Sequence, residues 1–282
     1  MSQQPEHSAV MAARHSSQRL WNSWQWDLPL AALAGMVAIL LLAADRPLFL
    51  GFNRLSAYTG DGFWAHVTIL GDTLIALALL LPLARRWPEL AWSGLLAGLL
   101  ATLFVQGFKQ ALHIPRPASL LPLDQFHVIG QAFLSRSFPS GHTATVFTFV
   151  GVLMLWLSAR WRRWLAGPLL LCAGLVGLSR VVVGAHWPLD VLGGIVAGWL
   201  GAVLGTLWAR RWSWGITPMG RRCLTLLLVG CALTGLLYYQ TGYPQTDGWR
   251  RILMALALLG TLYQIRLERQ AAARVKPAAE PH

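Results

Sequence analysis

Long apolar runs separated by short polar segments are the dominant pattern of this chain. Each of eight runs is close to the length of about 17–25 residues that crosses the hydrocarbon core of a bilayer as a helix. Because a segment inside a bilayer must satisfy its own backbone hydrogen bonds, we expect every run to be helical. The predicted spans are 28–44, 63–84, 89–108, 143–159, 164–180, 188–209, 223–239 and 250–265.

Composition agrees with a membrane protein. Hydrophobic residues make up 55% of the 282 positions and charged residues 12%, and the mean hydropathy is +0.50. Soluble domains contain roughly 25% charged residues, and the helices of a soluble core do not supply repeated runs of this length. The predicted fold class is all-α: a polytopic membrane helical bundle with a six-helix core and two C-terminal spans.

The lysines and arginines predict the orientation of the chain. With both termini in the cytoplasm, fifteen of these residues fall on inner segments and eight on outer segments, which is the bias of the positive-inside rule. The eight outer residues are Arg46, Arg54, Lys109, Arg116, Arg136, Arg180, Arg250 and Arg251. We therefore expect the outer segments to lie on the side of the membrane away from the cytoplasm. The expected location is a bacterial cytoplasmic (inner) membrane, with these segments facing the periplasm.

The same pattern divides the chain into four parts. We expect a cytoplasmic N-terminal segment over 1–27, a membrane core over 28–210, two additional spans over 211–265 and a cytoplasmic tail over 266–282. The two additional spans could pack beside the core, mediate oligomers or shape the access of a lipid, and their low polarity favours lateral packing. The oligomeric state is left open.

Charge and cysteine usage narrow the function classes. The net charge is +12, but the arginines form short clusters between apolar runs, which favours topology and anionic lipid surfaces over nucleic acid. The three cysteines, Cys172, Cys223 and Cys231, lie inside predicted spans. Cys and His residues lack the spacing of a metal site, and the outer side lacks a carboxylate cluster for Mg²⁺. We expect no cofactor and no metal.

Cations and an anion-binding helix start gather on the outer side. Lys109, Arg116 and Arg180 lie at or near predicted helix ends there, and charged residues at membrane depth are costly and usually functional. Arg matches phosphate oxygens with paired donors, and Lys offers a compact charge. Ser140 and Gly141 directly precede an apolar helix, so Ser140 is the expected N-cap and the exposed amides form an anion site. Taken singly, these features also fit interfacial anchoring and an ordinary helix start.

Two histidines complete the outer cluster. His186 and Asp190 are four residues apart with Pro188 between them, so a helix is expected to begin near Trp187 and to place the carboxylate one turn below the imidazole. A carboxylate that holds one ring nitrogen leaves the other as a nucleophile or base, although a single His–Asp pair is more often structural. His142 follows Gly141. Together with the cations, one histidine can attack phosphorus and the other can protonate the leaving oxygen.

This pattern resembles the signature of the type 2 phosphatidic acid phosphatase superfamily. The signature reads K-x6-R-P, P-S-G-H and S-R-x5-H-x3-D, and the chain matches all eleven specified positions over segments 109–117, 139–142 and 179–190. The resemblance covers roughly residues 60–210 and implies a six-helix core with its site at the outer face. Soluble vanadium haloperoxidases share the signature, but the apolar spans argue against that branch.

The resemblance implies a role for each matched residue. His186 is the expected nucleophile that becomes phosphorylated, Asp190 its orienting partner and His142 the general acid. The implied phosphate-binding residues are Lys109, Arg116, Ser140, Gly141 and Arg180. Ser179 is a possible supporting residue. Asp72 is another, because a carboxylate inside a span is a candidate functional group. The alternative is that Asp72 is a buried, hydrogen-bonded group.

The implied function is a metal-independent lipid phosphate phosphatase acting through a phospho-histidine. By resemblance, its substrate is undecaprenyl diphosphate, phosphatidylglycerophosphate or phosphatidic acid, and the sequence does not choose among them. A lipid phosphotransferase that passes phosphate to lipid A or another acceptor is one alternative. A non-catalytic lipid transporter is another, although the complete signature weighs against it.

Overall fold

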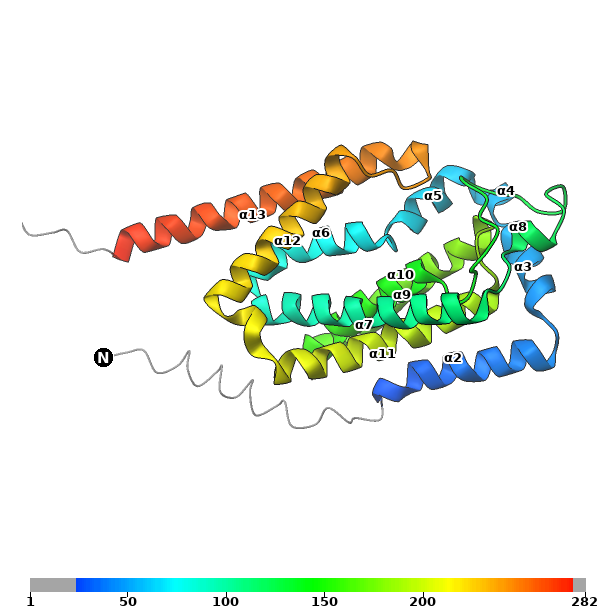
Figure 1. The fold of residues 1–282 in the computed structure, drawn as a ribbon, viewed down its shortest axis with the longest axis horizontal. Coiled ribbons are helices and arrows are strands. Elements are labelled where there is room, and N and C mark those ends of the chain that lie inside the picture. Colours follow the sequence, from blue (N-terminus) through cyan, green and yellow to red (C-terminus); the bar gives the residue numbers. More distant parts are fainter. Residues whose placement is uncertain (1–23, 276–282) are drawn as a thin grey trace, which may run out of the picture.

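Within residues 24–275, which the computed structural model describes, every regular element is a helix, as the sequence predicts. The long helices run side by side, and the short helices α4 and α8 lie near α3 and α5 at one end of the molecule (Figure 1). The longer helices are α2 (Trp24–Leu41), α3 (Asp45–Asn53), α5 (Asp61–Ile69), α6 (Thr73–Arg86), α7 (Pro88–Leu112), α9 (Gly141–Trp156), α10 (Ala159–Val182), α11 (Pro188–Arg211), α12 (Pro218–Leu237) and α13 (Asp247–Val275). The short helices are α4 (Ser56–Thr59), α8 (Pro117–Leu120), η2 (Ser213–Ile216) and η3 (Pro244–Thr246).

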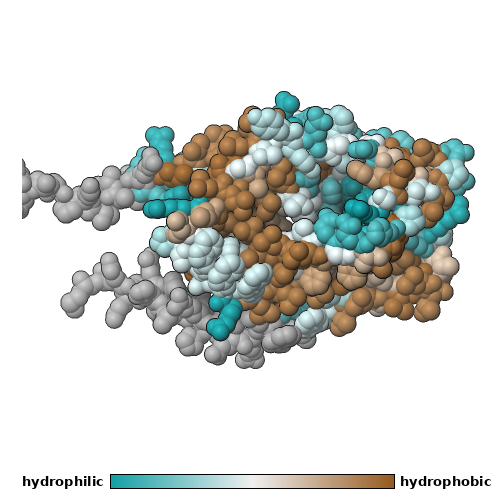
Figure 2. Space-filling model, viewed as in Figure 1, coloured by the Kyte–Doolittle hydropathy of each residue, from teal (hydrophilic) through white to brown (hydrophobic). Residues whose placement is uncertain are grey.

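Each of the eight predicted spans corresponds to helical structure in this part of the chain. Five helices, α2, α7, α10, α11 and α12, are long and apolar enough to cross a bilayer, and α5 with α6 makes a sixth if the bent pair counts as one span. Helix α9 is apolar but has only 16 residues. Helix α13 is outside this group, since charged residues flank its apolar stretch. Hydrophobic residues cover much of the face shown in Figure 2, as expected for contact with lipid, and hydrophilic residues gather toward one end.

The predicted span 63–84 is not one continuous helix. Helices α5 and α6 meet at a bend of 54°. Asp72 is the N-cap of α6, and its carboxylate accepts hydrogen bonds from the backbone N–H groups of Leu74 at 2.9 Å and Ile75 at 3.3 Å. A carboxylate that caps the next helix starts it in a new direction, so the apolar run contains two helices.

Helix α11 lies at the centre of the bundle and packs against α7, α9 and α2. Its small residues let neighbouring backbones approach. A Cβ built on Gly198 would lie 2.3 Å from the carbonyl oxygen of Ala144 in α9, and one on Gly205 would lie 2.3 Å from the Cα atom of Ala97 in α7. This close packing sets the starts of α9 and α11 beside each other at one end of the bundle.

The C-terminal helices form a hairpin that packs on α6 (Figure 1). Thr217 caps α12, and its hydroxyl accepts from the N–H of Gly220 at 3.1 Å. The connection over 238–246 turns back toward α5, and η3 within it contacts α5. Helix α13 continues to Val275, into the predicted tail 266–282. Residues 1–23 of the predicted N-terminal segment and 276–282 of that tail lie outside the described residues.

Candidate active site

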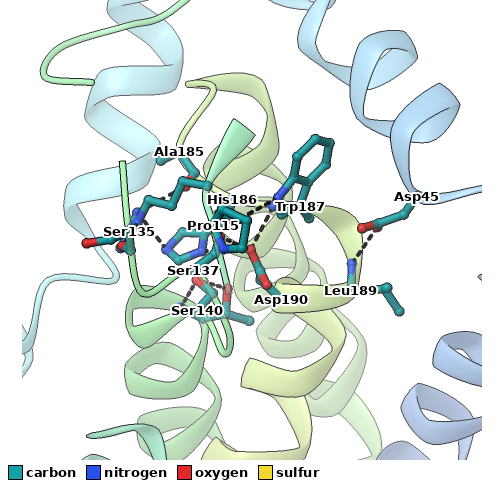
Figure 3. Close-up of polar contacts among 12 residues, drawn as sticks. Asp45, Pro115, Ser135, Ser137, Ser140, Ala185, His186, Trp187, Leu189 and Asp190 are labelled. Atoms are coloured by element: carbon teal, nitrogen blue, oxygen red, sulfur yellow. Dashed lines mark hydrogen bonds and ion pairs between the residues drawn. The ribbon is translucent and has the colours of Figure 1, made fainter. Parts of the chain in front are cut away.

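The junction of α10 and α11 holds the His–Asp pair predicted from sequence. Pro188 is the first residue of α11, and Trp187 is its N-cap, so the helix begins where its sequence predicts. The Nδ1 atom of His186 lies 3.1 Å from Oδ2 of Asp190. The same oxygen accepts from the N–H of Trp187 at 2.8 Å and from the hydroxyl of Ser137 at 2.5 Å. These bonds, drawn in Figure 3, fix the carboxylate beneath the imidazole.

His186 is buried, with 2% of its surface exposed. Its second ring nitrogen, Nε2, lies 3.3 Å from Nη1 of Arg116. A guanidinium only donates hydrogen bonds, so this contact requires an unprotonated Nε2 and places the ring proton on Nδ1, toward Asp190. Burial first, and then the positive charges of Arg116, Arg180 and Lys109, lower the pKa of His186 well below its ordinary value. The arrangement therefore keeps a neutral imidazole whose unprotonated Nε2 faces the guanidinium of Arg116.

Main-chain carbonyl groups hold Arg116. Its Nε donates to the carbonyl oxygen of Ser135 at 2.9 Å, and its Nη1 donates to that of Ala185 at 2.9 Å. The guanidinium carbon lies 5.0 Å from the centre of the Phe133 ring. Only 8% of Arg116 is exposed. The side chain is thus fixed beside His186 before any anion binds.

The start of α9 faces the same junction. The backbone N–H of Ser140 donates to the carbonyl oxygen of Asp190 at 2.9 Å, which ties the first turns of α9 and α11 together. Ser140 is the N-cap, as its sequence predicts, and its hydroxyl oxygen accepts from Oγ1 of Thr143 at 2.9 Å. A Cβ built on Gly141 would meet only Val105, at 3.9 Å, so space is open beside this first amide of the helix. An anion can approach the helix N-terminus there.

His142 is half-buried in the first turn of α9. The α5–α6 break packs directly against it, since a Cβ on Gly71 would lie 2.8 Å from the His142 carbonyl oxygen and 2.9 Å from its Cβ. The proximity of His142, like that of the three cations, contributes to the lowered pKa of His186. The structure thus gathers both histidines and Lys109, Arg116 and Arg180 around one site.

The remaining cations come from α7 and α10. Lys109 lies in the last turn of α7 and is half-buried. Arg180 lies in the last turn of α10 and is 2% exposed. Its Nη1 donates to the hydroxyl of Thr68 at 2.6 Å and to that of Tyr243 at 2.9 Å. Its Nε has no hydrogen-bond partner among the described residues, so a donor is left available for a bound anion.

Both predicted supporting residues form their hydrogen bonds elsewhere. The hydroxyl of Ser179 donates to the carbonyl oxygen of Val176 in its own helix at 2.6 Å. Asp72 caps α6 and accepts a hydrogen bond from the hydroxyl of Tyr239 at 2.5 Å. These contacts fit a buried, hydrogen-bonded Asp72, the structural alternative left open by the sequence.

Three polar residues that contact the site were missed from sequence. Ser137 lies only three positions before Ser140, inside the segment that carries the motif, and its hydroxyl on Asp190 could have been suspected from that proximity. Thr68 and Tyr243 are outside the signature, and no local pattern marks them. Across residues 24–275, no three His, Cys, Asp or Glu side chains are grouped in a way that could hold a metal ion.

Comparison with known proteins identifies the class. Residues 90–214 match the PAP2 superfamily. The crystal structure of LpxE from Aquifex aeolicus superposes with a TM-score of 0.51 at 30% sequence identity, covering 60% of this chain and 95% of that one. The chain belongs to the PAP2 superfamily, and it is an integral membrane helical bundle.

Curated relatives extend the match over part of their lengths. A lipid A 1-phosphatase of Rhizobium etli is 35% identical over 136 residues, which are 45% of this chain and 50% of the relative. An undecaprenyl-diphosphatase of Sulfolobus acidocaldarius is 48% identical over 64 residues, which are 23% of this chain and 27% of the relative. The chain thus spans half or less of the length of these relatives.

Proposed function

We propose that this protein is a membrane phosphatase that hydrolyses a lipid phosphate or diphosphate through a phosphorylated His186. The observation that carries this proposal is the fixed geometry of His186, whose Nδ1 is held by Asp190 and whose Nε2 faces Arg116. A nucleophile needs a free lone pair, and a phosphoryl group needs cations at its oxygens. The unprotonated Nε2 of His186 lies directly beside the guanidinium of Arg116, so both requirements are met in one place.

The proposed reaction has two steps. In the first, Nε2 of His186 attacks phosphorus, a phosphorus–nitrogen bond forms, and the phosphorus–oxygen bond to the lipid breaks. His142 gives a proton to the departing oxygen, which belongs to a lipid alcohol or, for a diphosphate, to a lipid monophosphate. In the second, His142 takes a proton from water, the water oxygen bonds to phosphorus, and the phosphorus–nitrogen bond breaks. Inorganic phosphate leaves, and both histidines return to their starting states.

In this proposal the remaining motif residues stabilise the charge on phosphorus. Lys109, Arg116 and Arg180 bind its oxygens, and the amide of Gly141 adds a donor from the helix start. Ser140 accepts from Thr143 and retains its own hydroxyl hydrogen for a phosphate oxygen. Asp190 orients His186. Asp72 and Ser179 support neighbouring backbone.

A lipid substrate is supported by an apolar cavity that opens beside Gly141. Helices α6, α7 and α9 line it, and its wall includes Leu80, Val105 and Phe149. Among the predicted site residues, only Gly141 lines this cavity. A lipid chain in the cavity would leave the phosphate at the start of α9. The names of the relatives make lipid A 1-phosphate and undecaprenyl diphosphate the first substrates to assay, followed by phosphatidylglycerophosphate and phosphatidic acid.

We propose further that the site faces the periplasm and that both termini are cytoplasmic. The argument is the excess of lysine and arginine on the opposite side, fifteen against eight. The ends of α7 and α10 and the starts of α9 and α11, which carry the motifs, share one end of the bundle (Figure 1). A cysteine-labelling reagent that cannot cross the membrane tests this orientation in intact cells, with Leu123→Cys as the outer reporter.

The function is tested by release of inorganic phosphate from this lipid panel with purified protein in detergent. His186→Ala is expected to reduce the rate by about 10³-fold or more. His127→Ala is the matched control, because His127 pairs with Asp61 at the surface. A chelator is expected to leave the rate unchanged, since the groups that bind the anion are cations and amides.

Three results would overturn the proposal. Full activity of a folded His186→Ala protein would exclude the nucleophile. Strict Mg²⁺ dependence would contradict the metal-independent reaction. If labelled phosphate moved from the substrate to a second lipid rather than to water, the protein would be a phosphotransferase.

A further inference from the structure

The C-terminal hairpin reaches the proposed site through its turn. Tyr243, in the connection between α12 and α13, is 4% exposed. A Cβ on Gly130 would lie 2.7 Å from the carbonyl oxygen of Gly242 and 2.8 Å from the Tyr243 ring. Gly130 has a φ of +80°, a backbone conformation that favours glycine. Because glycine has no Cβ, it also leaves room for this close contact. The turn therefore packs against the loop that precedes α9.

The hydroxyl of Tyr243 holds one edge of Arg180. It accepts a hydrogen bond from Nη1 at 2.9 Å, and Thr68 accepts a second from the same nitrogen at 2.6 Å. The guanidinium is planar, so fixing Nη1 also fixes the direction of its other donors. Nε is one of these donors, and it is buried without a partner in the described chain. The two hydroxyl groups thus aim the unpartnered edge of Arg180.

A second tyrosine fastens the same turn. Tyr239 donates from its hydroxyl to Oδ2 of Asp72 at 2.5 Å, and burial, reinforced by this bond to Asp72, raises the pKa of Tyr239. The hydroxyl therefore keeps its proton and remains a donor at neutral pH. At the other end of the turn, the hydroxyl of Thr246 donates to the carbonyl oxygen of Tyr243 at 2.8 Å. The hairpin is attached to the α5–α6 break on one side and to Arg180 on the other.

We propose that Tyr243 is a positioning residue of the active site, and that the C-terminal hairpin contributes to activity by supplying it. This inference rests on the proposed function, because it concerns the binding of a phosphoryl group by Arg180. The match to the PAP2 superfamily ends at residue 214, before α12. The hairpin thus supplies, from outside the matched region, a hydroxyl group that a cation of the signature uses.

The test is Tyr243→Phe, which keeps the ring against Gly130 and removes only the hydroxyl. Tyr238→Phe is the matched control, since Tyr238 lies in the same turn and is 81% exposed. Two quantities are measured: kcat/KM for phosphate release, and the Kd of orthovanadate, an anion of phosphate shape, by titration calorimetry. Both are expected to worsen about tenfold in Tyr243→Phe, the size of a lost hydrogen bond to a charged group, and to stay within about twofold in the control.

A double-mutant cycle separates positioning from general stability. In an Arg180→Ala background, Tyr243→Phe is expected to weaken orthovanadate binding by no more than about twofold, because its partner is already gone. An unchanged Kd in Tyr243→Phe alone would overturn the inference, as would a full tenfold effect in the Arg180→Ala background. Wild-type protein that binds orthovanadate but releases no phosphate would overturn the proposed function instead, and the binding cycle would still decide the role of Tyr243.

Discussion

Two arginines of the signature occupy the same site but are supported by different parts of the molecule. Arg116 donates to the main-chain carbonyl groups of Ser135 and Ala185. Arg180 donates to the side-chain hydroxyl groups of Thr68 and Tyr243. Any residue supplies a carbonyl group, but only a few supply a hydroxyl. The position of Arg116 therefore depends on the path of the backbone, whereas that of Arg180 depends on the identity of distant residues.

The partners of the two arginines also come from different regions of the sequence. Both partners of Arg116 lie between members of the signature. The partners of Arg180 lie on either side of the signature, in α5 and in the turn after α12. We infer that substitutions around Arg116 are tolerated as long as the loop keeps its course. Substitutions of the residues that bond to Arg180 should change activity because they change the position of the arginine.

The largest expected effect is the loss of activity when either arginine is removed. Without this loss, the two arginines could not be compared as parts of one site. Arg116→Ala and Arg180→Ala should each lower kcat/KM by about 10²–10³-fold, since each removes a charged donor from the developing charge on phosphorus. Arg54→Ala, an exposed cation on the same side, is the control and should have little effect. If either variant at the site kept wild-type turnover, that arginine would not contact the phosphate.

A smaller effect is expected at the α5–α6 break, which follows the turn of α5 that carries Thr68. Gly71→Ala introduces a methyl group within 2.9 Å of backbone and Cβ atoms of His142, so α9 or the break must move. A displacement of this kind near a reacting group can cost up to about 10²-fold in rate. The loss of kcat is measured beside the melting temperature.

Gly62→Ala is the control for Gly71→Ala, because a Cβ at Gly62 meets nothing within 4 Å. Gly62 lies in the first turn of α5, and Gly71 lies just after its last residue. Equal turnover in the two variants would show that the break does not position His142.

The sequence predicts the contacts of this site that are local in the chain, but not those made by distant residues. His186 and Asp190 could be paired because they lie on one turn of a helix whose start Pro188 marks, and Ser140 could be recognised as a cap from its place before an apolar run. These are local relations. Tyr243 and Thr68 are 63 and 112 positions from Arg180, and only the packing of the hairpin and of α5 brings them together.

The fold shows the same limit. Hydropathy found the apolar runs, because each needs about the length of a bilayer crossing. It also merged α5 and α6 into one span, since Gly71 and Asp72 hardly change the average over a run of leucine and alanine. At the bend one carboxylate caps α6, an interaction that an averaged property cannot register. The two extra helices were expected to pack laterally, and their turn contacts Arg180 as well.

A direct test of the contrast compares one substitution beside each arginine. Thr68→Val removes a hydroxyl from Arg180 and should lower kcat/KM about tenfold, because a hydrogen bond to a charged group is lost. Ser135→Ala leaves the carbonyl group that holds Arg116 in place and should stay within about twofold. Both are measured by phosphate release on the same lipid. A larger loss in Ser135→Ala than in Thr68→Val would reverse the comparison.

The smallest expected effect concerns the aromatic ring that packs on the guanidinium of Arg116. Phe133 stacks its ring against the guanidinium and is 41% exposed, and a cation–π contact at an exposed site contributes about 0.5–1 kcal/mol, or roughly two- to fivefold in affinity. Phe133→Ala should weaken orthovanadate binding by that factor and leave the melting temperature nearly unchanged. Leu134→Ala removes an exposed neighbour whose carbonyl group, not its side chain, bonds to Arg116. It should therefore match wild type, whereas a loss in Phe133→Ala as large as in Thr68→Val would mean that Arg116 also depends on side chains around it.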